Sequence, residues 1–309
     1  MVLRGLAQGS FASVFTPQVP VMKLSVAFPL AAAYNQDTAL EYAKLAGAAY
    51  CSDSALEAWS CGDKCSADVK SVKICKGDTT KSFVGVWDST CVVSFEGTSN
   101  IQSFITDLEF WKSSTDWDVC DGCKVHSGFL KEYKSMQSCV KQSLADLGCP
   151  SGSSIKTTGH SLGAAIDGIA MMDLHSAGWK IAESYNFGMP RTGNENFATE
   201  FNKLFSSIFY RVTHHRDPVV QVPPPELIVN WHFTHVEPEV FYKSKVSSGF
   251  QQCAENRDKK CSAQYWDIAI DLLSLGDHLD YMGVDTSFFG CKKGAEDGEL
   301  GEVPMMLMV

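Results

Sequence analysis

Residues 154–170, SIKTTGHSLGAAIDGIA, decide the fold. The β-branched run over 154–158 predicts a short strand, and the stretch over 162–175, rich in Ala, Ile and Met, predicts a helix. Between them lies a Gly-x-Ser-x-Gly pentapeptide, residues 159–163. In this motif the serine occupies a sharp turn that exposes its hydroxyl, and the small flanking residues let strand and helix pass closely. A chance match in a helix cap is the alternative, but the strand and the helix favour a nucleophilic Ser161.

The chain offers an acid and a base for this serine. In α/β-hydrolases the acid and then the base follow the serine along the chain. His278 is the best base, because it comes late and lies in a polar loop flanked by glycines. Asp217 is the best acid, because it follows a strand predicted over 207–213, at the end where α/β sites assemble. Asp277 is a rival acid, and the structural alternatives are an Asp-Pro turn for Asp217 and a solvated loop for His278.

Helical and strand-like segments alternate along most of the chain, and no internal repeat or long linker divides it. Such alternation predicts parallel βαβ crossovers, and therefore an α/β fold with a central, mostly parallel sheet flanked by helices. We expect helices over residues 35–50, 127–147, 162–175 and 193–205, and strands over 71–75, 82–87, 91–95, 154–158, 182–187 and 207–213.

Composition excludes several classes of protein. The chain has 309 residues, of which 45% are hydrophobic and 20% charged, a balance typical of folded proteins and not of disordered ones. The net charge of −10 disfavours nucleic-acid binding, which needs clustered Lys and Arg. The longest apolar runs, over 24–33 and 303–309, are shorter than the ~20 residues of a transmembrane helix. We therefore expect no membrane span.

The 12 cysteines indicate an oxidising compartment. An even and large number of cysteines in an acidic chain predicts disulfide bonds. The alternative is a zinc site with four thiolates, which leaves the other cysteines unexplained. That site would use two closely spaced pairs, Cys61 with Cys65 and Cys120 with Cys123.

The two ends of the chain differ from its centre. An apolar stretch ends in three alanines at 31–33, which is typical of a signal-peptide cleavage site, although Lys23 interrupts the stretch. The tail is acidic and then apolar, with no periodicity. We therefore expect a leader or signal region over 1–33, one α/β domain over 34–293 and an extension over 294–309. Such a protein would be secreted or would reside in the secretory lumen.

Together, these and other motifs resemble the class 3 lipases, the fungal-type triacylglycerol lipase family that also contains feruloyl esterases. The resemblance runs from about residue 37 to residue 291, and it implies an α/β-hydrolase fold and a triad of Ser161, Asp217 and His278. It also implies an oxyanion hole formed by the N–H and hydroxyl of Thr98 and by the N–H of Leu162. The motifs are LAGAAYC at 45–51, FEGT at 95–98, KVHSGF at 124–129, TGHSLG at 158–163, NFGMPRTGN at 186–194, RDP at 216–218 and DHLDYMG at 277–283.

The chain departs from the family at Glu96, where an arginine is usual. A strand side chain next to Gly97 need not face the site. We therefore expect the machinery to survive and a local ion pair to be lost or reversed. Ala164 replaces a frequent glycine, and a helix accepts this change readily.

The resemblance also sorts the cysteines. It implies four disulfides, which join Cys51 with Cys291, Cys61 with Cys65, Cys120 with Cys123 and Cys253 with Cys261. The pairing of the other four cysteines stays open. Cys75 and Cys91 can pair if they lie on neighbouring strands. Cys139 and Cys149 would be about 15 Å apart on a continuous helix, which is too far to bridge unless the helix ends between them.

Family lipases carry a short lid helix after the oxyanion residue. Here Ile101, Phe104, Ile105 and Leu108 follow the spacing of one apolar helix face. Such a face would cover the site in water and lie on a lipid surface when the lid opens. An ordinary helix packed on the core is the alternative. The feruloyl esterases have a polar segment here, so the apolar stripe favours a lipase.

These observations predict a secreted serine lipase that hydrolyses triacylglycerol esters through an acyl-enzyme at an oil–water or membrane interface. We expect a monomer without a metal, an organic cofactor or a nucleic-acid partner. Two alternatives stay open: a carboxylesterase or feruloyl esterase on soluble esters, and a catalytically inactive lipase-like binding protein. The acyl-chain length and the choice among triacylglycerol, phospholipid and galactolipid also stay open.

Overall fold

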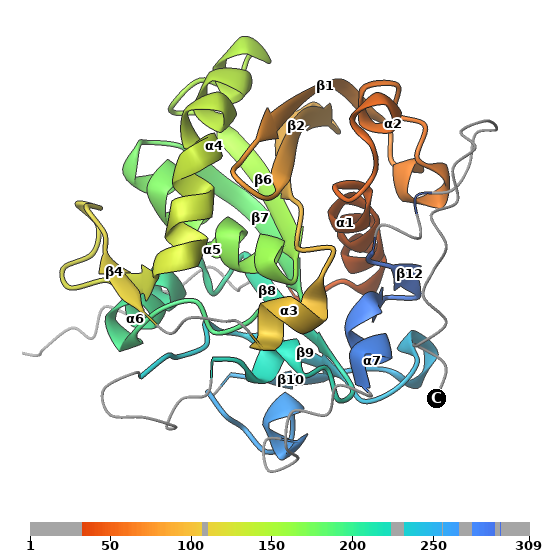
Figure 1. The fold of residues 1–309 in the computed structure, drawn as a ribbon, viewed down its shortest axis with the longest axis vertical. Helices are drawn as coiled ribbons and strands as arrows, with labels where there is room; N and C mark the ends of the chain where they lie inside the picture. Colours follow the sequence, from red (N-terminus) through yellow and green to blue (C-terminus); the bar gives the residue numbers. More distant parts are fainter. Residues whose placement is uncertain are drawn as a thin grey trace, which may run out of the picture. The chain divides into compact units, whose positions relative to one another are not determined.

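The structure is a computed structural model that describes residues 33–106, 111–223, 232–254, 256–265, 274–287 and 291. An eight-stranded mixed sheet runs through this described part in the order β1-β2-β3-β6-β7-β8-β9-β10 (Figure 1). The strands from β3 to β9 run parallel, and the pairs at both edges are antiparallel. The strands are β1 (Val69–Lys76), β2 (Lys81–Trp87), β3 (Thr90–Phe95), β6 (Ser154–His160), β7 (Lys180–Phe187), β8 (Phe209–His214), β9 (Glu239–Tyr242) and β10 (Gln251–Cys253).

Helices cover both faces of this sheet (Figure 1). Successive side chains of a strand point to opposite faces. Phe83 accordingly packs in a cluster with α1, whereas its neighbour Val84 packs in a cluster with helices of the other face. The helices are α1 (Gln36–Ala48) on the first face, and α4 (Ser127–Asp146), α5 (Leu162–Ser176) and α6 (Glu195–Phe205) on the second.

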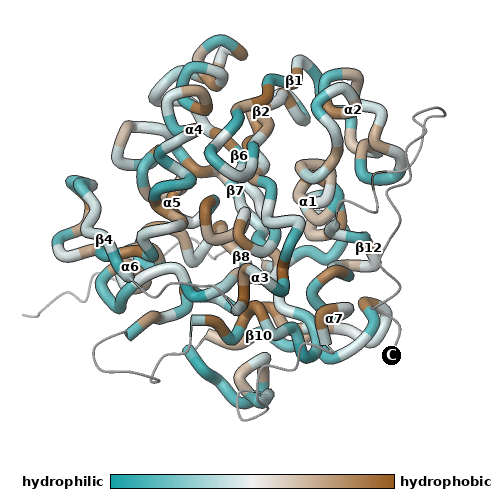
Figure 2. Tube along the Cα trace, viewed as in Figure 1, coloured by the Kyte–Doolittle hydropathy of each residue, from teal (hydrophilic) through white to brown (hydrophobic). Residues whose placement is uncertain are grey.

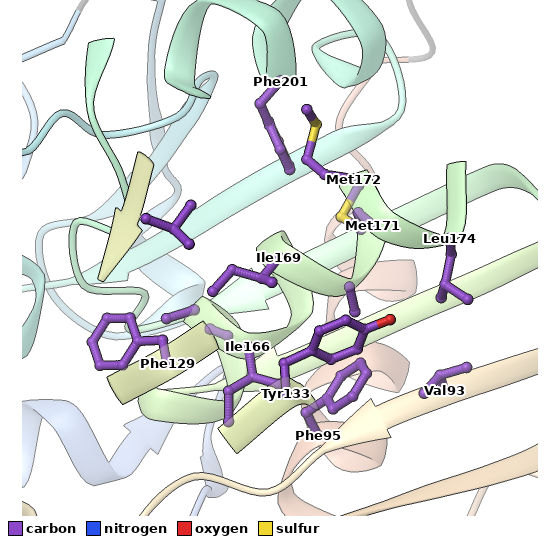
Figure 3. Packing of buried hydrophobic residues seen from close by; sticks show 14 of the residues in the cluster. Val93, Phe95, Phe129, Tyr133, Ile166, Ile169, Met171, Met172, Leu174 and Phe201 are labelled. Atoms are coloured by element: carbon purple, nitrogen blue, oxygen red, sulfur yellow. The ribbon is translucent and has the colours of Figure 1, made fainter. Parts of the chain in front are cut away.

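The largest core lies between the sheet and helices α4, α5 and α6. Figure 3 shows Ile166 and Ile169 of α5 packed near Phe129 and Tyr133 of α4. Apolar residues run along α5 (Figure 2), and a helix that is apolar on all sides is buried. Because α5 begins directly after Ser161, this packing holds the start of the helix in a fixed place.

The predicted elements are found within a few residues of their expected ends. The strand predicted over 154–158 continues to His160, and the helix predicted over 193–205 begins at Glu195. The prediction of a mostly parallel sheet flanked by helices is confirmed. Elements of two to five residues carry too little periodicity to predict. They include α2 (Asp53–Glu57), α7 (Leu275–Leu279), β4 (Lys112–Ser114), β5 (Lys124–His126), β11 (Asp280–Tyr281) and β12 (Val284–Asp285), besides β9 and β10.

All twelve cysteines are joined in disulfides. Cys75 of β1 pairs with Cys139 of α4, and Cys91 of β3 pairs with Cys149. A bond between Cys75 and Cys91 is wrong, because β2 lies between their strands. The zinc alternative is also wrong, because its four cysteines are in disulfides and supply no thiolates. The other pairs are the four that the resemblance implies: Cys51–Cys291, Cys61–Cys65, Cys120–Cys123 and Cys253–Cys261.

The two ends of the chain lie outside the described residues. They hold the leader predicted over 1–33, apart from Ala33, and the extension predicted over 294–309. The described residues belong to one unit, residues 31–309. Within the described part, no helix combines the length and the apolar character needed to cross a bilayer.

Candidate active site

Ser161 occupies the turn between β6 and α5. Its φ of 60° and ψ of −128° lie where residues other than glycine rarely occur. The Ser161 N–H donates to the Phe187 carbonyl at 2.9 Å, which anchors the turn to β7. Gly163 lets β3 pass close by, since a Cβ at this position would lie 2.8 Å from the carbonyl carbon of Phe95. The strained turn is therefore held from both neighbouring strands.

His278 and Asp217 meet beyond the carboxyl end of β8. His278 Nδ1 lies 2.8 Å from Asp217 Oδ2, and both side chains are fully buried. Asp217 also accepts hydrogen bonds from the Val219 N–H at 2.7 Å and from the Tyr281 hydroxyl. An ionised carboxylate only accepts, so His278 Nδ1 carries its proton toward Asp217 and Nε2 is left to accept one.

Two buried polar atoms of the site make no hydrogen bond within the described part of the chain. Neither Ser161 Oγ nor His278 Nε2 has a hydrogen-bond partner among the described residues. The residue before Ser161 lies against His278, with the ring centroids of His160 and His278 4.5 Å apart. A hydroxyl and an imidazole nitrogen are the atoms that exchange a proton in nucleophilic catalysis, and such contacts often tighten only when substrate binds.

The alternatives for these residues fail on geometry. Asp277 Oδ2 lies 2.9 Å from His215 Nδ1 and accepts from the Arg216 main-chain N–H at 3.3 Å. The alternative that Asp277 orients His278 is therefore wrong. His278 is fully buried, so the alternative of a solvated loop histidine is wrong. Asp217 accepts hydrogen bonds from His278 and Tyr281, so it is more than a residue of an Asp-Pro turn. Within the described residues, no group of three or more His, Cys, Asp or Glu side chains is arranged to hold a metal ion.

A second hydrogen-bonded chain links three segments of the site. His160 Nε2 lies 2.8 Å from the His278 carbonyl and must donate to it, because a carbonyl only accepts. Burial lowers the pKa of His160 well below its usual value, so the ring is neutral and Nδ1 accepts from the Tyr50 hydroxyl at 2.8 Å. The Gly97 N–H in turn donates to Tyr50. This chain ties the end of β3, the Ser161 turn and the His278 loop together.

Thr98 and Leu162 lie on the segments that flank this chain. A Cβ built on Gly97 would lie 3.1 Å from Ser161 Cβ, so the exit of β3 runs beside the nucleophile turn. Thr98 is half-buried, and its Oγ1 accepts from the Asn100 N–H at 3.2 Å. Leu162 is the first residue of α5, where main-chain N–H groups point out of the helix. Both segments can therefore direct N–H groups at an oxyanion near Ser161.

A groove of about 320 Å³ lies next to Leu162. Its apolar lining includes Phe104, which stacks on Phe129 with ring centroids 6.0 Å apart. Trp111 also lines the groove and is 65% exposed. The remaining lining residues are polar or small and comprise Asp78, Thr79, His126, Ser127, Gly128, Lys131 and Glu132. A groove of this size whose lining includes Phe104, Trp111 and Leu162 suits an acyl chain better than an ion.

The predicted lid residues lie on α3 (Ile101–Thr106). Ile105 is buried, Ile101 and Phe104 are half-buried, and all three pack against the largest core. Leu108 lies outside the described residues. The helix therefore packs on the core and also contributes Phe104 to the groove, so it combines features of a lid with those of the core-packed alternative.

Comparison with known proteins places this geometry in a family. A family model described as Lipase (class 3) matches residues 92–227. The crystal structure of lipase from Rhizopus microsporus var. chinensis is 30% identical with a TM-score of 0.66, and the match covers 85% of this chain and 91% of that one. The chain belongs to the class 3 lipase family. Its mostly parallel sheet with helices on both faces is the α/β-hydrolase fold.

Other proteins named as lipases give similar matches. Lipase II from Rhizopus niveus is 29% identical with a TM-score of 0.67, over 83% of this chain and 97% of that one. Secreted mono- and diacylglycerol lipase 1 of Fusarium solani is 33% identical over 168 residues, which are 52% of this chain and 48% of that protein. The match therefore spans about half the length of the curated relatives.

Sequence reasoning missed three residues of this class 3 lipase site. Tyr281 and Tyr50 hold Asp217 and His160, as described above. Gly188 has a φ of 59°, and a Cβ there would lie 2.8 Å from His278 Cε1. All three stand in motifs that carry the family resemblance, which is the signal that could have drawn attention to them.

Glu96, where the chain departs from the family, forms no ion pair among the described residues. Its Oε2 instead accepts from the Lys81 main-chain N–H at 3.1 Å. Burial raises the pKa of Glu96 to about 7. The side chain thus accepts a hydrogen bond from the main chain of β2, and the Lys81 charge acts on it without forming an ion pair.

Proposed function

We propose that the chain is a serine hydrolase that cleaves carboxylic esters of lipids, with Ser161 as nucleophile, His278 as base and Asp217 as the acid that orients it. One observation carries the proposal, the asymmetry of the His278 ring. Its Nδ1 is held by a buried carboxylate, and its Nε2 is buried without a partner among the described residues. Membership of the class 3 lipase family and the strained conformation of Ser161 support the same roles.

In the proposed reaction, His278 Nε2 takes the Ser161 proton as Oγ attacks the ester carbonyl. Asp217 stabilises the imidazolium that forms and keeps the ring in its orientation. The same nitrogen then protonates the departing alcohol. In the second half, it activates a water molecule that hydrolyses the acyl-enzyme and restores Ser161.

The charge that develops on the carbonyl oxygen needs donors, and we assign them to Thr98 and Leu162. The Leu162 N–H lies at the start of α5, where the helix dipole adds to its effect. The Thr98 hydroxyl already accepts from Asn100, which leaves its own proton to donate. Removal of one such donor typically costs about 10²–10³ in kcat.

The groove beside Leu162 supports a lipid acyl chain as the group that is recognised. The exposed Trp111 at this groove suits contact with an oil–water or membrane interface. Several relatives are named mono- and diacylglycerol lipases. We therefore propose glycerides, triacylglycerol among them, as substrates, and we propose α3 with Ile101, Phe104 and Ile105 as the lid.

The cellular setting follows from the disulfides. Disulfide-rich proteins belong to oxidising compartments, and relatives of this chain are named secreted lipases. We infer that the chain comprises a leader over 1–33, a lipase domain over 34–293 and an extension over 294–309, and that it is secreted as a monomer.

Hydrolysis assays on the full chain test the proposal. Wild type and Ser161→Ala are compared on emulsified long-chain mono-, di- and triacylglycerol and on a dissolved short-chain ester. Fatty-acid release from the emulsions by wild type alone is expected. Cleavage of the dissolved ester alone would move the protein to the carboxylesterases or feruloyl esterases. No cleavage by folded protein, or equal cleavage by both proteins, would overturn the proposal and favour an inactive binding protein or another nucleophile respectively.

A further inference from the structure

The ladder between β2 and β3 ends in an unusual way. Its last paired residues are Ser82 and Phe95, and the next pair along would be Lys81 and Glu96. The Glu96 N–H donates to the Lys81 carbonyl at 2.9 Å. In a regular antiparallel ladder the Lys81 N–H would donate the second hydrogen bond of this pair to the Glu96 main-chain carbonyl. It donates instead to Glu96 Oε2, at 3.1 Å.

The carboxylate thus replaces a main-chain carbonyl at the point where β3 ends. The released main chain turns against the nucleophile turn, where the Glu96 carbonyl carbon would lie 2.8 Å from a Cβ on Gly163. The next residue, Gly97, donates to Tyr50 and runs beside Ser161. Thr98 follows directly. Residues 96–98, here called the oxyanion arm, therefore begin at a side-chain hydrogen bond.

We propose that Glu96 is a positioning residue that sets the oxyanion arm by accepting the Lys81 N–H in place of the main chain. This inference rests on the proposed function, because it takes Thr98 as an oxyanion donor. Glu96 touches no substrate and acts through Thr98. An arginine at this position carries no acceptor and could not make the bond.

The surroundings of Glu96 make this hold sensitive to pH. The Lys81 ammonium binds Asp53 at 3.0 Å, and its charge also lowers the pKa of Glu96, against the effect of burial. Asp53 from α2 and Glu132 from α4 repel a charge on Glu96, and Tyr50 lies close enough for Glu96 to raise the pKa of its hydroxyl. Burial is the largest cause that raises the pKa of Glu96, to about 7. The ionised form accepts the stronger hydrogen bond, so the arm is held best above this pH.

Two substitutions test the inference. Glu96→Ala removes the acceptor, and Glu96→Gln keeps an acceptor that does not titrate. Glu57→Gln, on the exposed face of α2, is the matched control. We measure kcat and KM on a dissolved ester from pH 5.5 to 9, with Ser161→Ala alongside and unfolding midpoints for every variant.

Glu96→Ala is expected to lower kcat on the order of 10-fold, less than the loss of a whole oxyanion donor, with KM unchanged within about 2-fold. Glu96→Gln should restore kcat to near the wild-type value at acidic pH. The ratio of wild-type to Gln kcat should rise with pH, with a midpoint near 7. The two proteins differ only at residue 96, so this ratio isolates Glu96.

The opposite results overturn the inference. These are an unchanged kcat in folded Glu96→Ala, a loss that appears in KM alone, or a ratio of wild-type to Gln kcat that stays flat with pH. If Glu96→Ala does not fold, the pH dependence of the ratio of wild-type kcat to Glu96→Gln kcat tests the inference without it. Residual activity in Ser161→Ala would instead overturn the proposed function. An inactive Ser161→Ala together with a fully active Glu96→Ala would overturn only the inference about Glu96.

Discussion

Two fully buried carboxylates, Asp217 and Asp167, are held in contrasting ways. Asp217 uses both oxygens, since Oδ1 accepts from Val219 and Oδ2 accepts from His278 and Tyr281. Asp167, on α5, accepts three hydrogen bonds on Oδ2, while its buried Oδ1 has no partner among the described residues. The donors to Asp167 are Thr157 Oγ1 at 3.1 Å, Ser184 Oγ at 3.1 Å and Asn186 Nδ2 at 2.8 Å.

The difference lies in what each carboxylate can neutralise. The partners of Asp167 are hydroxyls and an amide, none of which takes a positive charge, and burial raises the pKa of Asp167 to about 7. Asp217 faces an imidazole that gains a positive charge when it takes a proton. Asp167 ties α5 to β6 and β7, whereas Asp217 is placed to stabilise a charge that appears during a reaction. Three substitutions test this difference between Asp217 and Asp167.

The largest effect is expected from Asp217→Asn. An amide neither stabilises the imidazolium nor fixes the proton on His278 Nδ1, so kcat should fall about 10³–10⁴-fold. The measurement is kcat and KM on a dissolved ester, with the unfolding midpoint as a check on folding. Asp277→Asn is the matched control, and it should lose less than about 10-fold because its carboxylate binds His215 instead. Equal losses in both variants would break the contrast.

Asp167→Asn should act on stability rather than on catalysis. The pKa of Asp167 is raised from 3.8 to about 7 in the folded chain, so its contribution to stability is full below pH 3.8 and is lost as the pH rises through about 7. Asparagine does not titrate. Relative to wild type, the variant should therefore gain free energy of unfolding between pH 4 and 8, by on the order of 4 kcal/mol at most.

Urea unfolding at a series of pH values measures this gain. The exposed Asp118→Asn is the control and should follow the wild-type curve. Parallel curves for Asp167→Asn and wild type would show that Asp167 does not titrate in this range. A kcat loss as large as that of Asp217→Asn would show that the two carboxylates are not functionally distinct.

The smallest effect is expected from Tyr281→Phe. It removes one of three donors to Asp217, and burial keeps the pKa of Tyr281 well above its usual value, so the hydroxyl donates at every working pH. One hydrogen bond to a charged group is worth ~1.5–3 kcal/mol at most, and two donors remain, so kcat should fall on the order of 10-fold. Tyr242→Phe, whose hydroxyl pairs with Tyr34 at 3.0 Å, serves as the control. An equal loss in both variants would contradict a specific role for Tyr281.

The sequence predicted the parts of the site that have local patterns. The Ser161 turn follows from one pentapeptide between a strand and a helix, and both neighbours are where the pattern puts them. The sheet and the long helices follow from periodicity over many residues. Asp217 and His278 were found because their order along the chain is restricted, and the structure brings them together.

The remaining features depend on contacts between distant residues. The pairing of Cys75 with Cys139 requires the strand order, because only the sheet shows that β2 separates Cys75 from Cys91. The partners of Asp167 come from two strands, β6 and β7, and nothing local marks a single aspartate in an apolar helix as bound to Asn186. The substitution of a side chain for a carbonyl at Glu96 likewise becomes visible only in the register of the ladder.

The central claim is that Ser161, activated by His278, forms a covalent acyl-enzyme. Treatment of the full chain with a p-nitrophenyl alkylphosphonate, followed by peptide mass spectrometry, tests it most directly. We expect a single adduct on Ser161, formed together with release of p-nitrophenolate and lost in His278→Ala that has kept its fold. An adduct on another residue, or folded wild-type protein that hydrolyses esters but acquires no adduct, would contradict it.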